Sequence, residues 1–343
     1  MGGSSRPEVL ALLNRNRPGR TPCFSGLINV TSAGLDTLGL KLSEVHCEPV
    51  RMAQAAATTY RLFGFESAVL PLNLCVEAAA LGARVDYGEK GQFMDWPRVV
   101  EALANSAQTF APAAPSDLAR AESVQAVTEA IGLLKQDVGG EIAVGAMVPG
   151  PFTLASLVIR LEPLLKETRT APGAVERVLD ALTEVVAQVA LAYRAAGADF
   201  VTVHEMGGSP GFIGPPAFKR FVLPRLQRLM AALPPPRVLS VCGNTTASIM
   251  ALAEAGADAI SVDQLNDLAQ SRQALGAGPL LFGNLDPVAT LLDGDPAAVR
   301  RAVAQAQAAG VDAIWPGCDL WPEAPRANLH AMVEAAKERG SEG

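Results

Sequence analysis

The sequence has 343 residues, of which 49% are hydrophobic and 18% are charged, and its net charge is −7. A chain of this length can bury a large core, as one large domain or as two ordinary ones. The acidic balance, without a basic stripe, argues against binding to nucleic acid or to an anionic membrane surface. Five scattered cysteines are typical of reduced thiols in a cytoplasmic protein, not of a secreted disulfide framework. Neither a signal peptide nor a membrane-spanning run is expected.

The chain opens with a helical segment at about residues 5–17, which we expect to lie outside the main fold. Two apolar runs that predict strands follow, at 21–30 and 67–74. Apolar runs then alternate with helical segments such as 174–197 and 296–310. The strands predicted in this second part are 142–148, 199–204, 237–242, 258–263, 280–283 and 312–317.

Three of the helical segments end in an Ala-Gly-x-Asp turn, at residues 196–199, 255–258 and 309–312. Glycine just past a helix end relieves the left-handed backbone position there, after which the chain enters the next strand. Strands alternating with helices in this way indicate a parallel sheet. Six strands and the two earlier ones make the eight of a (β/α)₈ TIM barrel. An open doubly wound sheet is the alternative. No linker is evident, so we expect residues 1–343 to form a single domain.

Polar residues follow the predicted strands directly. In a (β/α)₈ barrel the side chains that do chemistry lie in the loops after the strands, at one face. We therefore expect these side chains to gather at one mouth. They are Asn73, Cys75, Glu77, His204, Glu205, Cys242, Asn244, Asp263, Gln264, Asn284, Asp286, Cys318 and Asp319.

Cys242 and Cys318 are candidate zinc ligands, because they end the fifth and the eighth predicted strands. Zinc needs three or four thiolate, imidazole or carboxylate ligands. Asp263 would supply the third, with His204 or Glu205 as a fourth. The alternative is that each cysteine is a small buried hydrophobic residue.

His204 and Glu205 precede two glycines, a pattern that indicates a site loop, although a His–Glu hydrogen bond closing the strand end is the alternative. Asn284 and Asp286 either hold a ligand or cap the next helix. His46 and His330 are expected at the surface. Trp315 and Trp321 flank Cys318 and are expected to form an apolar wall beside the site. No phosphate-binding loop and no GxGxxG turn follows any predicted strand.

Several stretches together resemble the uroporphyrinogen decarboxylase superfamily, and within it the branch of methylcobamide:coenzyme M methyltransferases. The resemblance runs from about residue 6 to residue 338, and the decarboxylase's own N-terminal motif of Arg and aromatic residues is missing. The stretches are PLNLCVEAAALGARVDYG (71–88), GPFTLASLV (150–158), GADFVTVHEMGGSPGFIGPPAFKRFVLPRL (197–226), VCGN (241–244), GADAISVDQ (256–264), GNLDPVATLLDGDPAAV (283–299) and PGCDLWPEAPRANLHAMVEAAKE (316–338).

The resemblance implies a (β/α)₈ barrel with a zinc site whose ligands are His-x-Cys, a later carboxylate and a C-terminal Cys. These positions correspond to Ser240, Cys242, Asp263 and Cys318, so a serine stands where the family has histidine. Three alternatives remain open. His204 supplies the missing imidazole, or zinc is held weakly with water in that place, or zinc is lost and tetrahydrofolate is the acceptor.

The resemblance also implies transfer of a methyl group from a methylcobamide, free or carried by a corrinoid protein, to an acceptor thiol such as coenzyme M or to tetrahydrofolate. His204, Glu205 and Asp263 are the predicted catalytic residues. A uroporphyrinogen decarboxylase-like lyase acting on a tetrapyrrole is the alternative, and a homodimer is compatible with the sequence. The residues predicted to bind the cofactor are Asn73, Glu77, Asn244, Asn284 and Asp286.

Overall fold

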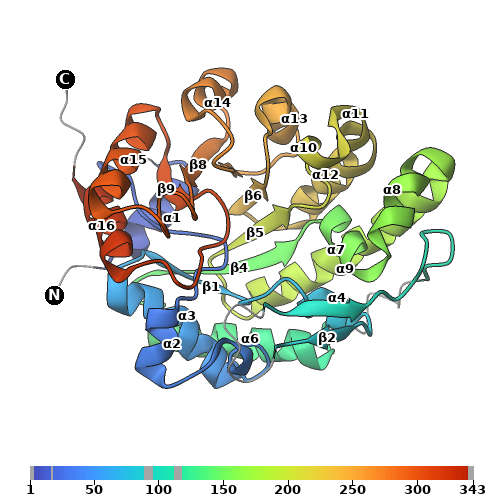
Figure 1. Cartoon of the computed structure of the whole chain (residues 1–343), viewed down its shortest axis with the longest axis horizontal. Coiled ribbons are helices and arrows are strands. Elements are labelled where there is room, and N and C mark those ends of the chain that lie inside the picture. The colour runs from blue at the N-terminus through green and yellow to red at the C-terminus, as the bar shows by residue number, and fades with distance from the viewer. Residues whose placement is uncertain (1–3, 17, 89–95, 112–117, 339–343) are drawn as a thin grey trace.

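A parallel sheet forms the centre of the molecule in the computed structural model, which describes residues 4–16, 18–88, 96–111 and 118–338 (Figure 1). Seven strands lie in the order β1-β4-β5-β6-β7-β8-β9, and each pairs in parallel with its neighbours. Six of them follow one another in the chain, as expected when a helix connects each strand to the next. The strands are β1 (Ser67–Leu70), β4 (Ala143–Pro149), β5 (Phe200–Glu205), β6 (Arg237–Val241), β7 (Ala259–Val262), β8 (Leu280–Leu285) and β9 (Ala313–Pro316).

Residues 22–25 close the sheet into a barrel. Cys23 forms a parallel bridge with Ile314 of β9. The Phe24 amide donates to the Ile314 carbonyl at 3.3 Å, and the Glu66 amide before β1 donates to the Cys23 carbonyl at 3.0 Å. The (β/α)₈ barrel is therefore confirmed and the open sheet is wrong. The predicted strand at 21–30 shortens to this bridge, because the chain leaves the sheet and packs Gly26 against Thr202 and Trp315.

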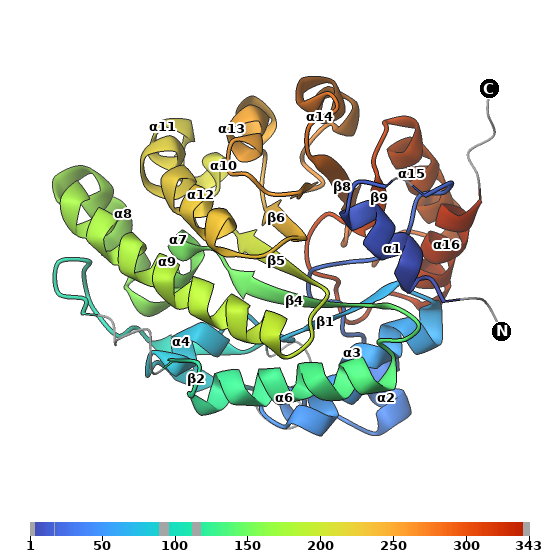
Figure 2. The same ribbon diagram turned by 180° about the vertical axis from the view of Figure 1, so that it is seen from behind.

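Helices wrap the outside of the barrel, as Figure 2 shows from behind. The predicted opening helix is α1, and the predicted helices at 174–197 and 296–310 are α9 and α15. A two-stranded antiparallel sheet of β2 (Arg84–Asp86) and β3 (Arg98–Glu101) is added after α4. The helices are α1 (Arg6–Leu13), α2 (Ser32–Leu38), η1 (Leu42–Glu44), α3 (Pro49–Phe63), α4 (Val76–Ala80), α6 (Glu122–Asp137), α7 (Pro151–Val158), α8 (Leu161–Thr170), α9 (Pro172–Ala195), α10 (Pro210–Ile213), α11 (Pro215–Ala217), η2 (Phe218–Val222), α12 (Leu223–Ala232), η3 (Thr246–Ser248), α13 (Ile249–Ala253), α14 (Leu268–Leu275), α15 (Pro296–Ala308) and α16 (Arg326–Lys337).

The predicted Ala-Gly-x-Asp turns take the backbone form that glycine favours. Gly197, Gly256 and Gly310 have φ angles of 114°, 82° and 84°. Each glycine lies between the end of a helix and the start of the following strand, so the turn sets the point at which β5, β7 and β9 begin. None of the helices in the described ranges combines the length and the apolar character needed to cross a bilayer.

The strand register brings three polar side chains together on neighbouring strands. His204 of β5 pairs with Ser240 of β6, and Ser240 pairs with Ser261 of β7. Residues paired across parallel strands point to the same side, so these three side chains lie next to one another.

Trp315 is fully buried, and its ring centroid lies 5.2 Å from that of Phe24 and 5.0 Å from that of Phe282. Trp315 is therefore part of the core, and its expected place in a wall beside the site is wrong.

Candidate active site

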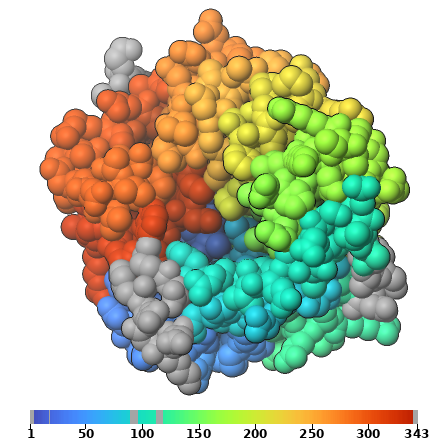
Figure 3. All heavy atoms as spheres, turned by 45° about the vertical axis from the view of Figure 1, so that its right-hand side comes forward, coloured from blue at the N-terminus to red at the C-terminus, as the bar shows by residue number. Residues whose placement is uncertain are grey.

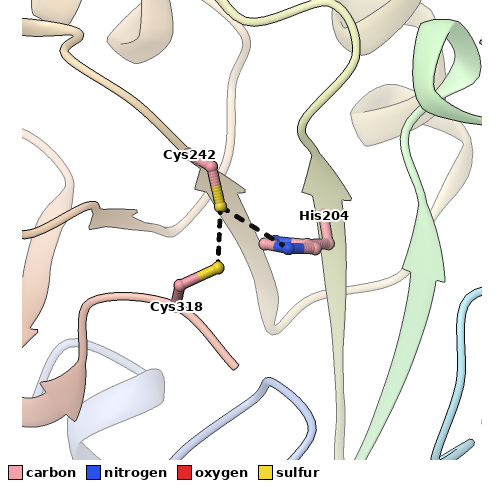
Figure 4. Close-up of side chains that lie close together, drawn as sticks. All are labelled: His204, Cys242 and Cys318. Atoms are coloured by element: carbon pink, nitrogen blue, oxygen red, sulfur yellow. Dashed lines mark hydrogen bonds between the residues drawn. The ribbon is translucent and has the colours of Figure 1, made fainter. Parts of the chain in front are cut away.

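Three side chains from distant parts of the chain converge at the mouth of the barrel (Figure 4). His204 ends β5, Cys242 follows β6, and Cys318 follows β9. The Cys242 Sγ lies 3.7 Å from the His204 Nε2 and 3.0 Å from the Cys318 Sγ. One nitrogen and two sulfurs that could hold a metal ion thus lie within 4.8 Å of one another. The expected meeting of the two cysteines is confirmed, and His204 joins them.

The His204 ring has a hydrogen-bond partner in Ser240, at the position where the resemblance implies a histidine. Its Nδ1 lies 3.1 Å from the Ser240 Oγ, and the whole side chain is buried. When Nδ1 carries the proton and donates to Ser240, Nε2 is left as a free lone pair on the side of the thiols. A partner of this kind on one ring nitrogen fixes both the tautomer and the orientation of a metal-binding imidazole.

The two thiols and the imidazole share protons. A hydrogen bond from Cys242 and the adjacent His204 lower the pKa of Cys318 to about 4. The same hydrogen bond, together with burial, raises the pKa of Cys242. Burial lowers the pKa of His204, but the hydrogen bond to Cys318 and the nearby negative charges of Asp319, Cys318 and Glu205 together raise it above its ordinary value. A thiolate beside an imidazole is the state in which cysteine binds metals and acts as a nucleophile.

Asp263 does not belong to the group of three, and its expected role as a metal ligand stays a prediction. Its Oδ2 accepts the Gly243 amide and its Oδ1 accepts the Leu265 amide, both at 2.9 Å. These two amides connect the carboxylate to the loop after β6 and to its own loop after β7. Asp263 nevertheless lines the cavity above the thiols.

Asp319 was noted at a strand end but not predicted as a site residue. Its Oδ1 accepts the Ile28 amide at 2.9 Å, and it lines the same cavity as Cys318. Burial and the neighbouring Cys318 raise its pKa to about 6. Its position directly after a candidate ligand was the signal that could have found it.

The three-residue group opens into a cavity of about 500 Å³ through Cys242 and Cys318. Figure 3 shows a hollow in this face, with N-terminal residues in dark blue at its floor and C-terminal residues in red beside it. A cavity of this size suits a small molecule. Its other lining residues are mostly apolar; the full set adds Ile28, Asn73, Leu74, Trp96, Pro97, Met206, Asp263, Gln264, Pro287, Val288, Asp319, Leu320 and Trp321.

Glu205 does not face this cavity, although it was expected to be catalytic. It is fully buried, and its oxygens accept the amides of Phe152, Thr153 and Gly208 at 3.1, 2.9 and 2.9 Å. The Thr153 hydroxyl also donates to it, at 2.5 Å. Glu205 therefore fixes the first turn of α7. The alternative considered for this pair, a His204–Glu205 hydrogen bond, is not among the contacts of Glu205 in the described part of the chain. Its predicted acid-base role is not supported by this geometry.

Of the five residues predicted to bind the cofactor, only Asn73 lines the cavity. Glu77 is fully buried on α4, which packs against α6, α7 and α9 in the outer layer. Asn244 is exposed and its Oδ1 accepts the Thr246 amide at 3.1 Å. Asn284 donates to the carbonyls of Asp263 and Asn266, and Asp286 accepts the Val288 and Ala289 amides at 2.8 Å. Asp286 thus caps the turn at residues 287–292. The next helix, α15, has Asp295 at its N-terminal cap, so the expected capping of that helix by Asp286 is wrong.

The two other histidines differ from each other. His330 is exposed, as expected. His46 is buried, with its Nδ1 3.5 Å from the Asn73 Nδ2, so its expected place at the surface is wrong. Burial lowers the pKa of His46 to about 3, which keeps the ring neutral. The short sequence around His46 carries no periodic pattern that could have revealed its burial.

Comparisons with known proteins agree with this geometry. A family model described as uroporphyrinogen decarboxylase (URO-D) matches residues 4–339. The chain is 30% identical to a methylcobamide:CoM methyltransferase of Methanosarcina barkeri over 97% of both chains. It is 28% identical to a uroporphyrinogen decarboxylase of Rhodococcus opacus, over 79% of this chain and 76% of that one. A solved methyltransferase from Methanosarcina mazei superposes with a TM-score of 0.91 at 27% identity, covering 98% of both chains.

Proposed function

Since the chain belongs to the uroporphyrinogen decarboxylase (URO-D) family and is one of its methyltransferases, we propose that it moves a methyl group from a methylcobamide to a thiol. The observation that carries this proposal is the convergence of His204, Cys242 and Cys318 beneath a small cavity. The named function of the relatives supports the donor and the thiol class of acceptor. Tetrahydrofolate as acceptor, a homodimer and a cytoplasmic location stay predictions.

The donor set fits zinc. One imidazole nitrogen and two thiolate sulfurs are ligands that zinc prefers, and three protein ligands leave a fourth place for substrate. We propose that His204 supplies the imidazole that Ser240 lacks, with Ser240 orienting the ring. When bound, zinc would hold the acceptor's sulfur as a thiolate. Of the three alternatives that Ser240 left open, this is the one in which His204 supplies the missing imidazole.

The remaining chemistry is a displacement at the methyl carbon. The acceptor's sulfur forms the new S–C bond, and the cobalt–carbon bond breaks with its electron pair staying on cobalt, which leaves cob(I)amide. Cys242 and Cys318 set the depth at which the sulfur lies, and the apolar wall that includes Trp96 and Trp321 keeps water away. Holding the acceptor's sulfur in line with the methyl carbon can supply much of the reduction in the activation barrier. The corrinoid then has to cover the mouth, because the acceptor occupies the cavity.

Elemental analysis together with a transfer assay tests the proposal. The purified protein should contain about one zinc per chain and should methylate a thiol with free methylcobalamin as donor. The Cys242→Ser/Cys318→Ser variant should lose both zinc and transfer, while its circular dichroism stays unchanged. Full transfer by that variant would refute the proposed site. A zinc-free wild type that methylates tetrahydrofolate and no thiol would refute the proposed acceptor.

The role of Ser240 is tested in the same assay. Ser240→Ala removes the partner of the His204 Nδ1 and should weaken zinc binding by about 10- to 100-fold in a chelator competition. Ser261→Ala is the matched control, since Ser261 is the register neighbour of Ser240 and its Oγ has no hydrogen-bond partner in the described part of the chain. Equal zinc affinities of the two variants would show that Ser240 does not orient the ligand.

A further inference from the structure

The charges that line the cavity all have one sign. Asp263 and Asp319 are its charged residues, and no lysine or arginine lines it within the described ranges 4–16, 18–88, 96–111 and 118–338. A negatively charged group on the acceptor would therefore lie beside two carboxylates with no cation among those lining residues. Like charges brought together in a partly buried site repel strongly, because little water is present to screen them.

Three backbone amides around the cavity donate to the chain's own carboxylates. Asp263 accepts the amides of Gly243 and Leu265, and Asp319 accepts the amide of Ile28, each at 2.9 Å. Backbone N–H groups of this kind are the usual alternative to a lysine or an arginine in anion binding. These residues therefore provide neither a cationic side chain nor a free backbone amide to bind a sulfonate or a carboxylate.

The uncharged polar residues of the cavity provide no positive charge either. The Asn73 Oδ1 accepts the Cys75 amide at 2.8 Å, so this oxygen is already engaged. Gln264 lines the cavity, but its Oε1 is buried away from the cavity surface. The carboxylates of Asp263 and Asp319 are therefore the groups to which the far end of an acceptor could donate hydrogen bonds.

We propose that the acceptor is a small thiol whose far end is positively charged or neutral and donates hydrogen bonds. Asp263 and Asp319 select against a thiol that carries a second negative charge. The inference rests on the proposed function and narrows its substrate class. It separates this chain from the relative named for coenzyme M, whose thiol, 2-mercaptoethanesulfonate, carries a sulfonate.

Three thiols of equal length test the proposal: cysteamine, 2-mercaptoethanol and 2-mercaptoethanesulfonate. Dissociation constants from calorimetry and kcat/KM with methylcobalamin should both favour cysteamine over the sulfonate, by on the order of tenfold or more. 2-Mercaptoethanol should lie between them. Tighter binding and faster transfer of the sulfonate than of 2-mercaptoethanol would overturn the inference and leave the proposed function intact. Methylation of none of the three by the zinc-loaded protein would overturn the proposed function itself.

Variants separate the effect of the cavity from the intrinsic reactivity of each thiol. Asp319→Asn removes a charge while its Oδ1 can still accept the Ile28 amide, and it should reduce the cysteamine-to-sulfonate ratio several-fold. Asp267→Asn is the control, because Asp267 is exposed and caps α14 through the Gln270 amide. It should leave the ratio unchanged. An unchanged ratio in Asp319→Asn would overturn the role of this carboxylate.

Discussion

At the scale of single residues, Ser240 and His204 lie side by side on two neighbouring strands. The resemblance implies a histidine at the position of Ser240. The register pairs these two residues, so an imidazole on either strand can point to the same side of the barrel. On the proposed function, His204 therefore supplies from β5 the imidazole that Ser240 cannot supply from β6.

Burial of the Glu77 carboxyl group should make the folded state less stable as the pH rises. Both of its oxygens are buried without a hydrogen-bond partner among the described residues, and burial raises its pKa to about 8. The unfolded chain releases this proton near pH 4, so the folded state loses stability as pH rises from about 4 to about 8. Glu77→Gln should therefore be more stable than the wild type at about pH 9, by on the order of 4 kcal/mol, and similar to it at about pH 4.

Urea denaturation at both pH values measures this difference. Glu129→Gln on the exposed side of α6 is the control and should follow the wild type at each pH. A Glu77→Gln variant that is less stable than the wild type at high pH would contradict the prediction, and would indicate a partner for the Glu77 carboxylate in solution.

At the scale of an element, α7 depends on a carboxylate from another strand. Gly150 precedes its first turn, and Glu205 of β5 accepts the free amides of Phe152 and Thr153. A negative charge at a helix N-terminus is favoured both by these amides and by the helix dipole. Gly150 has no room for a side chain, because a Cβ there would lie 2.3 Å from the Glu205 Oε2.

Glu205→Gln tests whether this residue positions α7 or acts in acid-base chemistry. The variant should lower the free energy of unfolding by about 2–3 kcal/mol, because the amide group cannot replace every acceptor. The pH profile of kcat/KM should keep its shape, since Glu205 does not line the cavity. Loss of one limb of that profile with unchanged stability would restore the acid-base role. Thr153→Ser, which keeps the hydroxyl, is the control.

At the scale of the whole molecule, closure of the barrel rests on a short segment near the N-terminus. Glu66, which precedes β1, accepts the Cys23 amide at 2.7 Å and the Arg20 Nη1 at 2.9 Å. These contacts hold residues 20–25 between β9 and β1. The barrel therefore depends on a carboxylate that is itself buried.

Glu66→Gln should destabilise the protein by about 2 kcal/mol, because Arg20 loses the charge-assisted hydrogen bonds to its buried partner and keeps only its ion pair with Glu8. Asp137→Asn removes one member of the exposed Arg61–Asp137 pair and should change the free energy of unfolding by less than about 1 kcal/mol. Urea denaturation followed by circular dichroism compares the two. Equal effects would mean that the Glu66 contacts do not stabilise closure.

The order of the strands, the turns between them and the barrel could be predicted from the sequence, because each depends on local patterns. Apolar runs form strands, and glycine at 197, 256 and 310 ends the helices before them. The meeting of Cys242 and Cys318 could also be predicted, since all strands of a parallel barrel end at one face.

The tertiary structure alone decided which strand-end residues enter the site. Glu205 and Asp286 accept backbone amides near them, Asp263 accepts an amide of the loop after β6, and Glu77 lies in the helix layer. A residue's place at a strand end fixes where its backbone lies. The direction of its side chain depends on the donors and the space that distant segments bring to it, and these are contacts that the local sequence does not encode.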